Sequence, residues 1–73
     1  MEARLATATK RVDVQALRDK LKLSQAEFAH RFHFNRRTLQ DWEQGRATPD
    51  SAVQAYLQVI ERAPEVVAQA LAR

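Results

Sequence analysis

Residues 24–45, SQAEFAHRFHFNRRTLQDWEQG, predict two short helices joined by a tight turn. Ser24 is a suitable N-cap for the first helix, and Glu27 three residues later completes an S-x-x-E capping box. Asn35 is equally suited to cap the second helix. Gly45 can end that helix, because glycine adopts the left-handed backbone conformation without strain.

The second of these helices has two chemically distinct sides. At about 100° per residue, one side carries arginines, amides and one acid: Arg36, Arg37, Gln40, Asp41 and Gln44. Leu39 and Trp42 lie on the opposite, apolar side. Arginine can donate two hydrogen bonds to guanine and glutamine can pair with adenine, so the polar side suits base edges in a major groove. The stretch therefore predicts a helix-turn-helix whose second helix recognises DNA, although two arginines on a helix also suit a solvated face.

The composition predicts one small, folded domain. The 73 residues are 45% hydrophobic and include one glycine and two prolines, which favours a mostly helical protein over a disordered one. There is no cysteine, so a disulfide framework and a thiolate metal site are both excluded. No apolar run approaches the roughly 18 residues of a membrane span, and no signal-peptide core is evident, so we expect a cytoplasmic protein.

Basic charge is concentrated in the first part of the chain. Residues 1–46 contain ten Lys and Arg residues against six Asp and Glu residues, a net charge of +4. Residues 47–73 contain two against three, a net charge of −1. This asymmetry suits a polyanionic partner for the first part, but a charge of this size is also ordinary for a solvated surface.

The ends of the chain differ in character. Residues 1–11, MEARLATATKR, lack a strong apolar period, so we expect a flexible basic tail followed by a domain over residues 12–73. Such a tail could reach DNA phosphates or a minor groove, or could have no role. At the other end, a short helix over residues 64–71 is too short to be stable alone. Its apolar side must pack on its own domain or on a second copy, and we favour a homodimer.

Two further helices complete the expected domain. One begins near Asp13, which can cap it. The other is expected to be capped by Thr48, to have Pro49 at its first position and to run to about Arg62. The apolar positions that should face the core are Val14, Leu17, Leu21, Phe28, Ala29, Phe32, Leu39, Trp42, Val53, Tyr56, Leu57 and Ile60, while Val66, Val67, Ala70 and Leu71 make up the apolar side of the last helix.

No catalytic or metal site is expected. His30 and His33 are three positions apart, but no third or fourth ligand is evident nearby. Gly45 is the only glycine in the sequence, so there is no glycine-rich phosphate loop. We find neither a nucleophile with a positioned base nor paired carboxylates on one face, and we therefore expect no enzyme activity, no cofactor and no metal.

Residues 23–49, LSQAEFAHRFHFNRRTLQDWEQGRATP, resemble the helix-turn-helix of the Cro/C1 repressor family, also called the XRE family. That family's pattern is roughly an S/T-Q opening, E-hydrophobic-A, a glycine turn, a hydrophobic residue before an S/N cap, and then W/hydrophobic-E-x-G-x-x-x-P. The matching positions are Leu23, Ser24, Gln25, Glu27, Phe28, Ala29, Phe34, Asn35, Leu39, Trp42, Glu43, Gly45 and Pro49. His33 replaces the turn glycine, and histidine is among the residues that tolerate a positive φ. The resemblance implies an all-α, compact five-helix domain like that of lambda repressor.

The resemblance also implies which residues contact DNA. Gln25 and Asn35 would contact the backbone or base edges, and the base contacts would come from the polar side of the second helix. The full expected set is Gln25, Asn35, Arg36, Arg37, Gln40, Asp41 and Arg46. Asp41 repels phosphate unless it accepts from a cytosine amino group or restrains Arg37, four residues before it, and we favour restraint.

A structural ion pair is implied in the same way. The family often pairs the glutamate of its W-E-x-G segment with an arginine of the first helix, and Glu43 and Arg18 hold those positions. Glu43 lies beside Leu39 on the helical wheel, so it should be partly buried and need such a partner.

A narrower resemblance concerns antitoxins of the HigA kind. It rests on residues 37–45, RTLQDWEQG, and on residues 63–71, APEVVAQAL. Such proteins bind an RNase toxin of the RelE/HigB group and repress their own operon as dimers. The resemblance therefore implies a palindromic DNA operator, a homodimer and a toxin partner. The alternatives are a stand-alone XRE-family regulator without a toxin and, in another class, a protein-binding adaptor without DNA contact.

Overall fold

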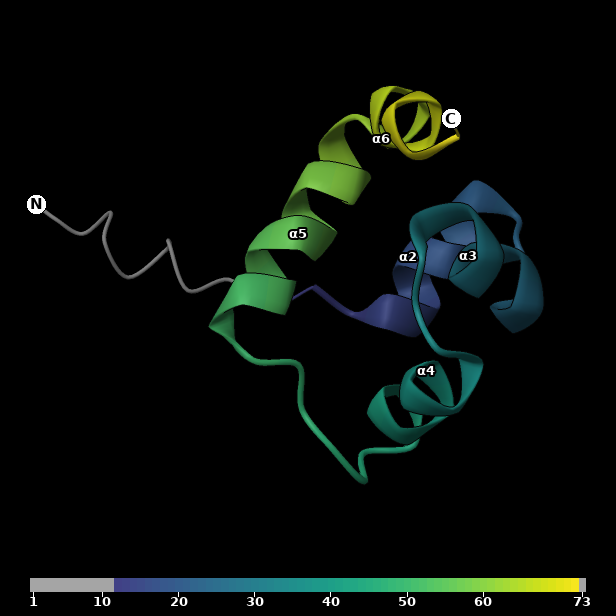
Figure 1. The fold of residues 1–73 in the computed structure, drawn as a ribbon. Helices are drawn as coiled ribbons and strands as arrows, with labels where there is room; N and C mark the ends of the chain where they lie inside the picture. The colour runs from purple at the N-terminus through teal and green to yellow at the C-terminus, as the bar shows by residue number, and fades with distance from the viewer. Residues whose placement is uncertain (1–11, 73) are drawn as a thin grey trace, which may run out of the picture.

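The computed structural model describes residues 12–72, which form five helices and no strand (Figure 1). The helices are α2 (Val14–Leu21), α3 (Gln25–Phe32), α4 (Arg36–Glu43), α5 (Ser51–Arg62) and α6 (Pro64–Leu71). Helix α3 packs against α4, α2 contacts α4, and α6 contacts both α3 and α5. The all-α, five-helix prediction is confirmed, whereas the prediction of a flexible tail over residues 1–11 lies outside the described residues.

The predicted caps of the first three helices are present. Asp13 caps α2. At α3 the Ser24 hydroxyl accepts from the Glu27 N–H at 3.1 Å, and the Glu27 carboxylate accepts from the Ser24 N–H at 2.8 Å. The Asn35 side-chain oxygen accepts from the first-turn N–H groups of α4. These interactions satisfy N–H groups that a helix leaves unpaired, which is why the sequence pattern located these helix starts correctly.

Left-handed residues end α3 and follow α4. His33 has φ +62° and takes the place of a turn glycine, as predicted. The next residue, Phe34, donates its N–H to the Ala29 carbonyl at 2.9 Å, which closes the turn between the two helices. Gly45 has φ +78° and donates its N–H to the Trp42 carbonyl at 3.2 Å. The chain therefore turns sharply on both sides of α4.

The start of α5 was predicted wrongly. The helix begins at Ser51, two residues after Pro49, and its cap is Asp50 rather than Thr48. The Asp50 carboxylate accepts from the Val53 N–H at 2.9 Å. An aspartate is a stronger cap than a threonine, and Asp50 stands three residues before an N–H that needs an acceptor, so the helix starts there.

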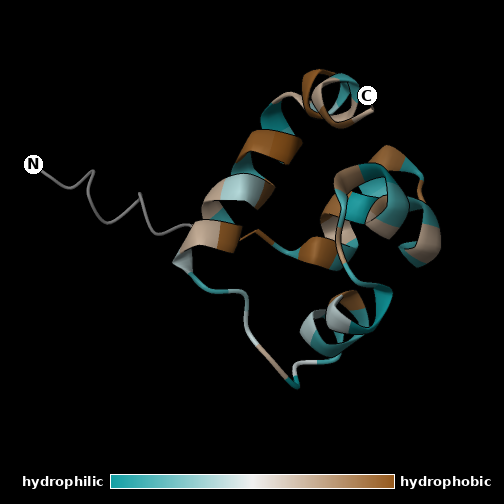
Figure 2. Cartoon of the chain, viewed as in Figure 1, coloured by the Kyte–Doolittle hydropathy of each residue, from teal (hydrophilic) through white to brown (hydrophobic). Residues whose placement is uncertain are grey.

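The core lies between all five helices. Five large side chains in it are almost completely buried: Phe28, Phe32, Leu39, Leu57 and Ile60. Figure 2 shows hydrophobic segments on α2, α5 and α6, while α4 is mainly white or teal. Helix α6 buries Val67 within its own chain, but Val59 and Val66 are 52% and 65% exposed. Val67 is therefore covered by its own domain, whereas Val66 of the same helix stays exposed, and the homodimer stays a prediction.

The described part of the chain contains neither a membrane-spanning helix nor a cluster of metal-binding side chains. Between residues 12 and 72 no helix combines the length and the apolar character that a membrane span needs. Over the same range, no three His, Cys, Asp or Glu side chains gather as ligands of a metal ion would.

Candidate nucleic-acid interface

The polar side of α4 faces solvent. Arg36 and Arg37 are exposed, and Gln40 is half-buried one turn further along. On the opposite side Leu39 is buried, and Trp42 packs against the core. This arrangement leaves two guanidinium groups and an amide on the accessible side of a helix whose other side is anchored in the domain.

An aromatic cluster fixes how α4 sits on α3 and α5. The Phe34 ring, in the turn, stacks on Phe28 at a centroid distance of 5.8 Å and meets the edge of Trp42 at 5.5 Å. It also lies 5.4 Å from Tyr56, whose hydroxyl donates to the Phe32 carbonyl at 2.9 Å. Burial raises the pKa of Tyr56, so the hydroxyl remains a donor. Sequence patterns did not predict this hydrogen bond, because it joins residues on helices that are far apart in the chain.

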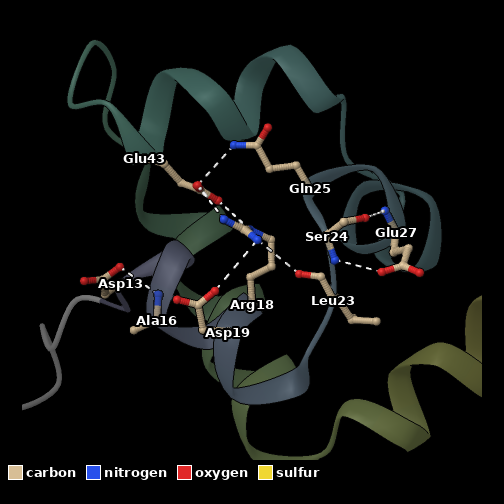
Figure 3. A network of polar contacts seen from close by, with 9 residues as sticks. All are labelled: Asp13, Ala16, Arg18, Asp19, Leu23, Ser24, Gln25, Glu27 and Glu43. Carbon is tan, nitrogen blue, oxygen red and sulfur yellow. Dashed lines mark hydrogen bonds and ion pairs between the residues drawn. The ribbon is translucent and has the colours of Figure 1, made fainter.

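A network of polar side chains joins α2, α3 and α4 (Figure 3). Arg18 donates from Nε and Nη2 to the two carboxylate oxygens of Glu43, each at 2.9 Å, and from Nη1 to the Leu23 carbonyl at 3.1 Å. The Gln25 amide donates to the Glu43 Oε1 at 3.1 Å. The Arg18 and Glu43 side chains are only 15% and 7% exposed. The predicted pair is therefore present, and it holds the end of α4 against the other two helices.

Gln25 differs from its predicted environment. The resemblance places Gln25 at a contact with the DNA backbone or base edges, but its side chain is half-buried, and its amide donates to Glu43. The two residues are 18 positions apart, so no local sequence signal could have revealed the contact. Its predicted DNA contact stays a prediction, and the hydrogen bond gives Gln25 a second role in orienting α3 against α4.

The same network sets the charge state of Glu43. Hydrogen bonds from Arg18 lower the pKa of the Glu43 carboxyl, and they outweigh the opposing effect of burial. The pair with Glu43 correspondingly raises the pKa of Arg18. Both groups are therefore ionised at neutral pH, as a bidentate pair requires.

Stability is expected to fall at acidic pH because of this carboxyl. The folded pKa of Glu43 is below its unfolded value of about 4.3, so the contribution is complete above the unfolded pKa and is lost as pH falls through the folded pKa. The difference in free energy of unfolding between wild type and Glu43→Gln should be largest near pH 6 and shrink below about pH 4. Urea denaturation at each pH measures this difference, and a difference that does not change with pH would contradict the assignment.

Glu27→Gln is the matched control for this experiment. Hydrogen bonds with Ser24 also lower the pKa of Glu27. Glutamine preserves the capping box, and Glu27 is exposed, so this variant should have a smaller effect than Glu43→Gln.

The remaining predicted contacts lie at the two ends of α4. Asn35 uses its side-chain oxygen to cap the helix, accepting from the Arg37 N–H at 2.8 Å. Asp41 lies 3.5 Å from the Nε of Arg37, so the predicted restraint of that arginine is confirmed. Arg46 donates to the same carboxylate from Nε at 3.1 Å. This second arginine was expected only as a DNA contact, because the turn that brings it back to Asp41 is not evident in the sequence.

Comparison with known proteins identifies the family of this arrangement. The family described as Helix-turn-helix matches residues 14–65. Antitoxin HigA-2 of Vibrio cholerae serotype O1 is 33% identical over 55 residues, which are 75% of this chain and 53% of that protein. This chain thus spans about half the length of that curated relative.

A solved structure agrees with this family. The crystal structure of an HTH XRE-family like protein from Agrobacterium tumefaciens is similar with a TM-score of 0.80 at 47% identity, covering 81% of this chain and 95% of that one. The two proteins therefore share their fold and 47% of their residues over 81% of this chain. The chain therefore belongs to the XRE family of helix-turn-helix DNA-binding proteins.

Proposed function

We propose that this DNA-binding regulator is a sequence-specific repressor and the antitoxin of a HigA-like toxin–antitoxin pair. The observation that carries the DNA role is the polar side of α4, where Arg36 and Arg37 are exposed while Leu39 anchors the helix in the core. The toxin role is supported by the 33% identity to Antitoxin HigA-2. In this proposal the protein neutralises an RNase toxin of the RelE/HigB group and represses its own operon in the cytoplasm.

The proposed mechanism uses two copies of α4. A homodimer would insert α4 of each protomer into major grooves about one helical turn, roughly 34–36 Å, apart on a palindromic operator. Arg36, Arg37 and Gln40 would contact base edges, because their donors match guanine and adenine. Asn35 and Gln25, near the starts of α4 and α3, would contact the DNA backbone or base edges. An occupied operator would then block transcription.

Arg36→Ala and Arg37→Ala test the base contacts. Each change is expected to weaken binding to the specific site by about 1–3 kcal/mol and to relax selectivity at one base position. Selection of the operator from random duplexes, followed by fluorescence anisotropy titration, measures both quantities. Arg62→Ala is the charge-matched control, because Arg62 is exposed at the far end of α5 from α4 (Figure 1). If Arg36→Ala or Arg37→Ala lowers affinity equally for specific and random DNA, the arginine that was replaced contacts a phosphate and not a base.

Salt dependence separates DNA binding from a protein-binding adaptor. Each phosphate contact should contribute about −0.9 to the slope of log affinity against log salt concentration. A wild-type protein without measurable, salt-sensitive binding to duplex DNA would contradict the repressor role and favour the adaptor.

The toxin partner is tested by affinity purification of the tagged protein from its own host, with mass spectrometry of the associated proteins. A small RNase-like protein at equal stoichiometry would support the antitoxin role, and DNA binding would then serve autoregulation. If the tagged protein is recovered only with further copies of itself and with DNA, that result would contradict the antitoxin role.

A stand-alone XRE-family regulator is the second candidate. The Agrobacterium tumefaciens protein, 47% identical over 95% of its length, supports an XRE-family regulator, which fits both candidates. The same purification distinguishes the two candidates, since only the antitoxin requires a stoichiometric protein partner.

A further inference from the structure

Asp41 places a negative charge on the side of α4 that is proposed to face DNA. Its Oδ1 lies 3.5 Å from the Nε of Arg37 and 3.1 Å from both Nε and Nη2 of Arg46. One carboxylate is thus shared by two guanidinium groups, and both belong to the expected DNA-contacting set. An unpaired acid at this position would repel phosphates. The Asp41 carboxylate instead pairs with Arg37 and Arg46, which are the two cations that would otherwise bind phosphates.

The backbone, and not only side-chain rotamers, brings Arg46 to Asp41. The Asp41 carbonyl accepts from the Arg46 N–H at 2.8 Å and from the Ala47 N–H at 3.3 Å. Gly45, with φ +78°, permits this return of the chain. The guanidinium of Arg46 also donates to the side-chain oxygen of Gln44. Arg46 is therefore held beside the end of α4 by contacts to its backbone and to its side chain.

These ion pairs are too exposed to matter much for folding. The Arg37 and Arg46 side chains are 75% and 53% exposed, and Asp41 is 29% exposed. Exposed pairs of this kind contribute little to stability because water and salt screen them. Their main consequence is electrostatic, since two positive charges and one negative charge meet at the end of α4 instead of two unopposed cations.

We propose that Asp41 is a specificity-determining residue that weakens binding to random DNA. This inference rests on the proposed DNA-binding role. A phosphate on any sequence must compete with the Asp41 carboxylate for Arg37 and Arg46. On the correct operator, Arg37 also gains hydrogen bonds to a base edge, and its restraint by Asp41 reduces the conformational freedom lost on binding. The carboxylate therefore reduces non-specific affinity more than specific affinity.

Asp41→Asn tests this proposal, because it removes the charge and nearly preserves the shape. Affinity for a random duplex is expected to rise, and its salt slope to steepen by about 0.9 for each arginine released to a phosphate. Between 50 and 200 mM salt, that slope corresponds to an additional loss of affinity of about 3- to 4-fold per released arginine. The ratio of specific to random affinity should fall, as measured on the selected operator.

Two further variants separate this effect from net charge and from Arg46. Glu65→Gln removes the same charge from an exposed position on α6 and should leave the affinity ratio unchanged. In an Arg46→Ala background, Asp41→Asn should produce a smaller change, because one of the two released cations is missing. Circular dichroism melting of each variant verifies that the fold is retained.

Several results would overturn the proposal. One is a ratio of specific to random affinity that changes as little in Asp41→Asn as it does in Glu65→Gln. Another is a loss of affinity in Asp41→Asn that is confined to operators with cytosine at one position, because Asp41 would then contact that base directly. If the wild type shows no salt-dependent binding to DNA, both the proposed function and this inference fail. If the wild type binds and only the Asp41 effect is missing, the inference alone fails.

Discussion

Glu43→Ala is expected to lower the free energy of unfolding by about 3 kcal/mol, as for a buried ion pair that loses one partner. The substitution leaves the Arg18 guanidinium in a mostly buried site without its two hydrogen bonds to the carboxylate. It also frees the Gln25 amide, so three helices lose their common contact. Urea denaturation followed by circular dichroism measures the loss directly.

A double-mutant cycle assigns this loss to the pair. If Arg18 and Glu43 act together, Arg18→Ala/Glu43→Ala should be less destabilised than the sum of the single variants. Glu65→Ala, an exposed glutamate on α6, should change stability little. An unchanged melting temperature in Glu43→Ala would show that the pair contributes nothing to the fold.

Phe28→Ala is expected to be at least as damaging, with a loss of about 3–5 kcal/mol. The Phe28 side chain has no exposed surface, and its ring contacts Phe32 at 4.9 Å and Phe34 at 5.8 Å. Its removal would leave a cavity where α3 meets the turn. This loss is a large part of the about 5–15 kcal/mol by which domains are stable in total, so the melting temperature should fall by more than about 10 °C.

Val59→Ala is the matched control for the core substitution. Val59 is an exposed apolar residue of α5, so its truncation should change stability by less than about 0.5 kcal/mol. Thermal denaturation of both variants tests the prediction, and a Phe28→Ala protein with wild-type stability would contradict the packing of Phe28 against Phe32 and Phe34. DNA affinity should be lost only in the variant that unfolds.

The local features of the helix-turn-helix could be predicted from the sequence because each depends on residues only a few positions apart. Ser24 with Glu27, and Asn35 with the first turn of α4, are such cases. The polar side of α4 follows from helical periodicity, whereas the left-handed turn at His33 was expected because His33 replaces the turn glycine of the family. The start predicted for α5 was wrong because Thr48 and Asp50 are both possible caps, and aspartate is the stronger of the two.

The pair of Arg18 with Glu43 was expected from the family resemblance rather than from local pattern, and only the crossing of α2 and α4 makes it possible. The bonds of Gln25 to Glu43 and of Tyr56 to the carbonyl of Phe32 span 18 and 24 positions, and neither was expected. Helical periodicity shows which side of a helix is polar, but it does not contain the angle or the depth at which two helices pack. Those quantities come from how the side chains of the whole core fit together, so the tertiary structure alone decided that Gln25 meets Glu43 and that Tyr56 meets the Phe32 carbonyl.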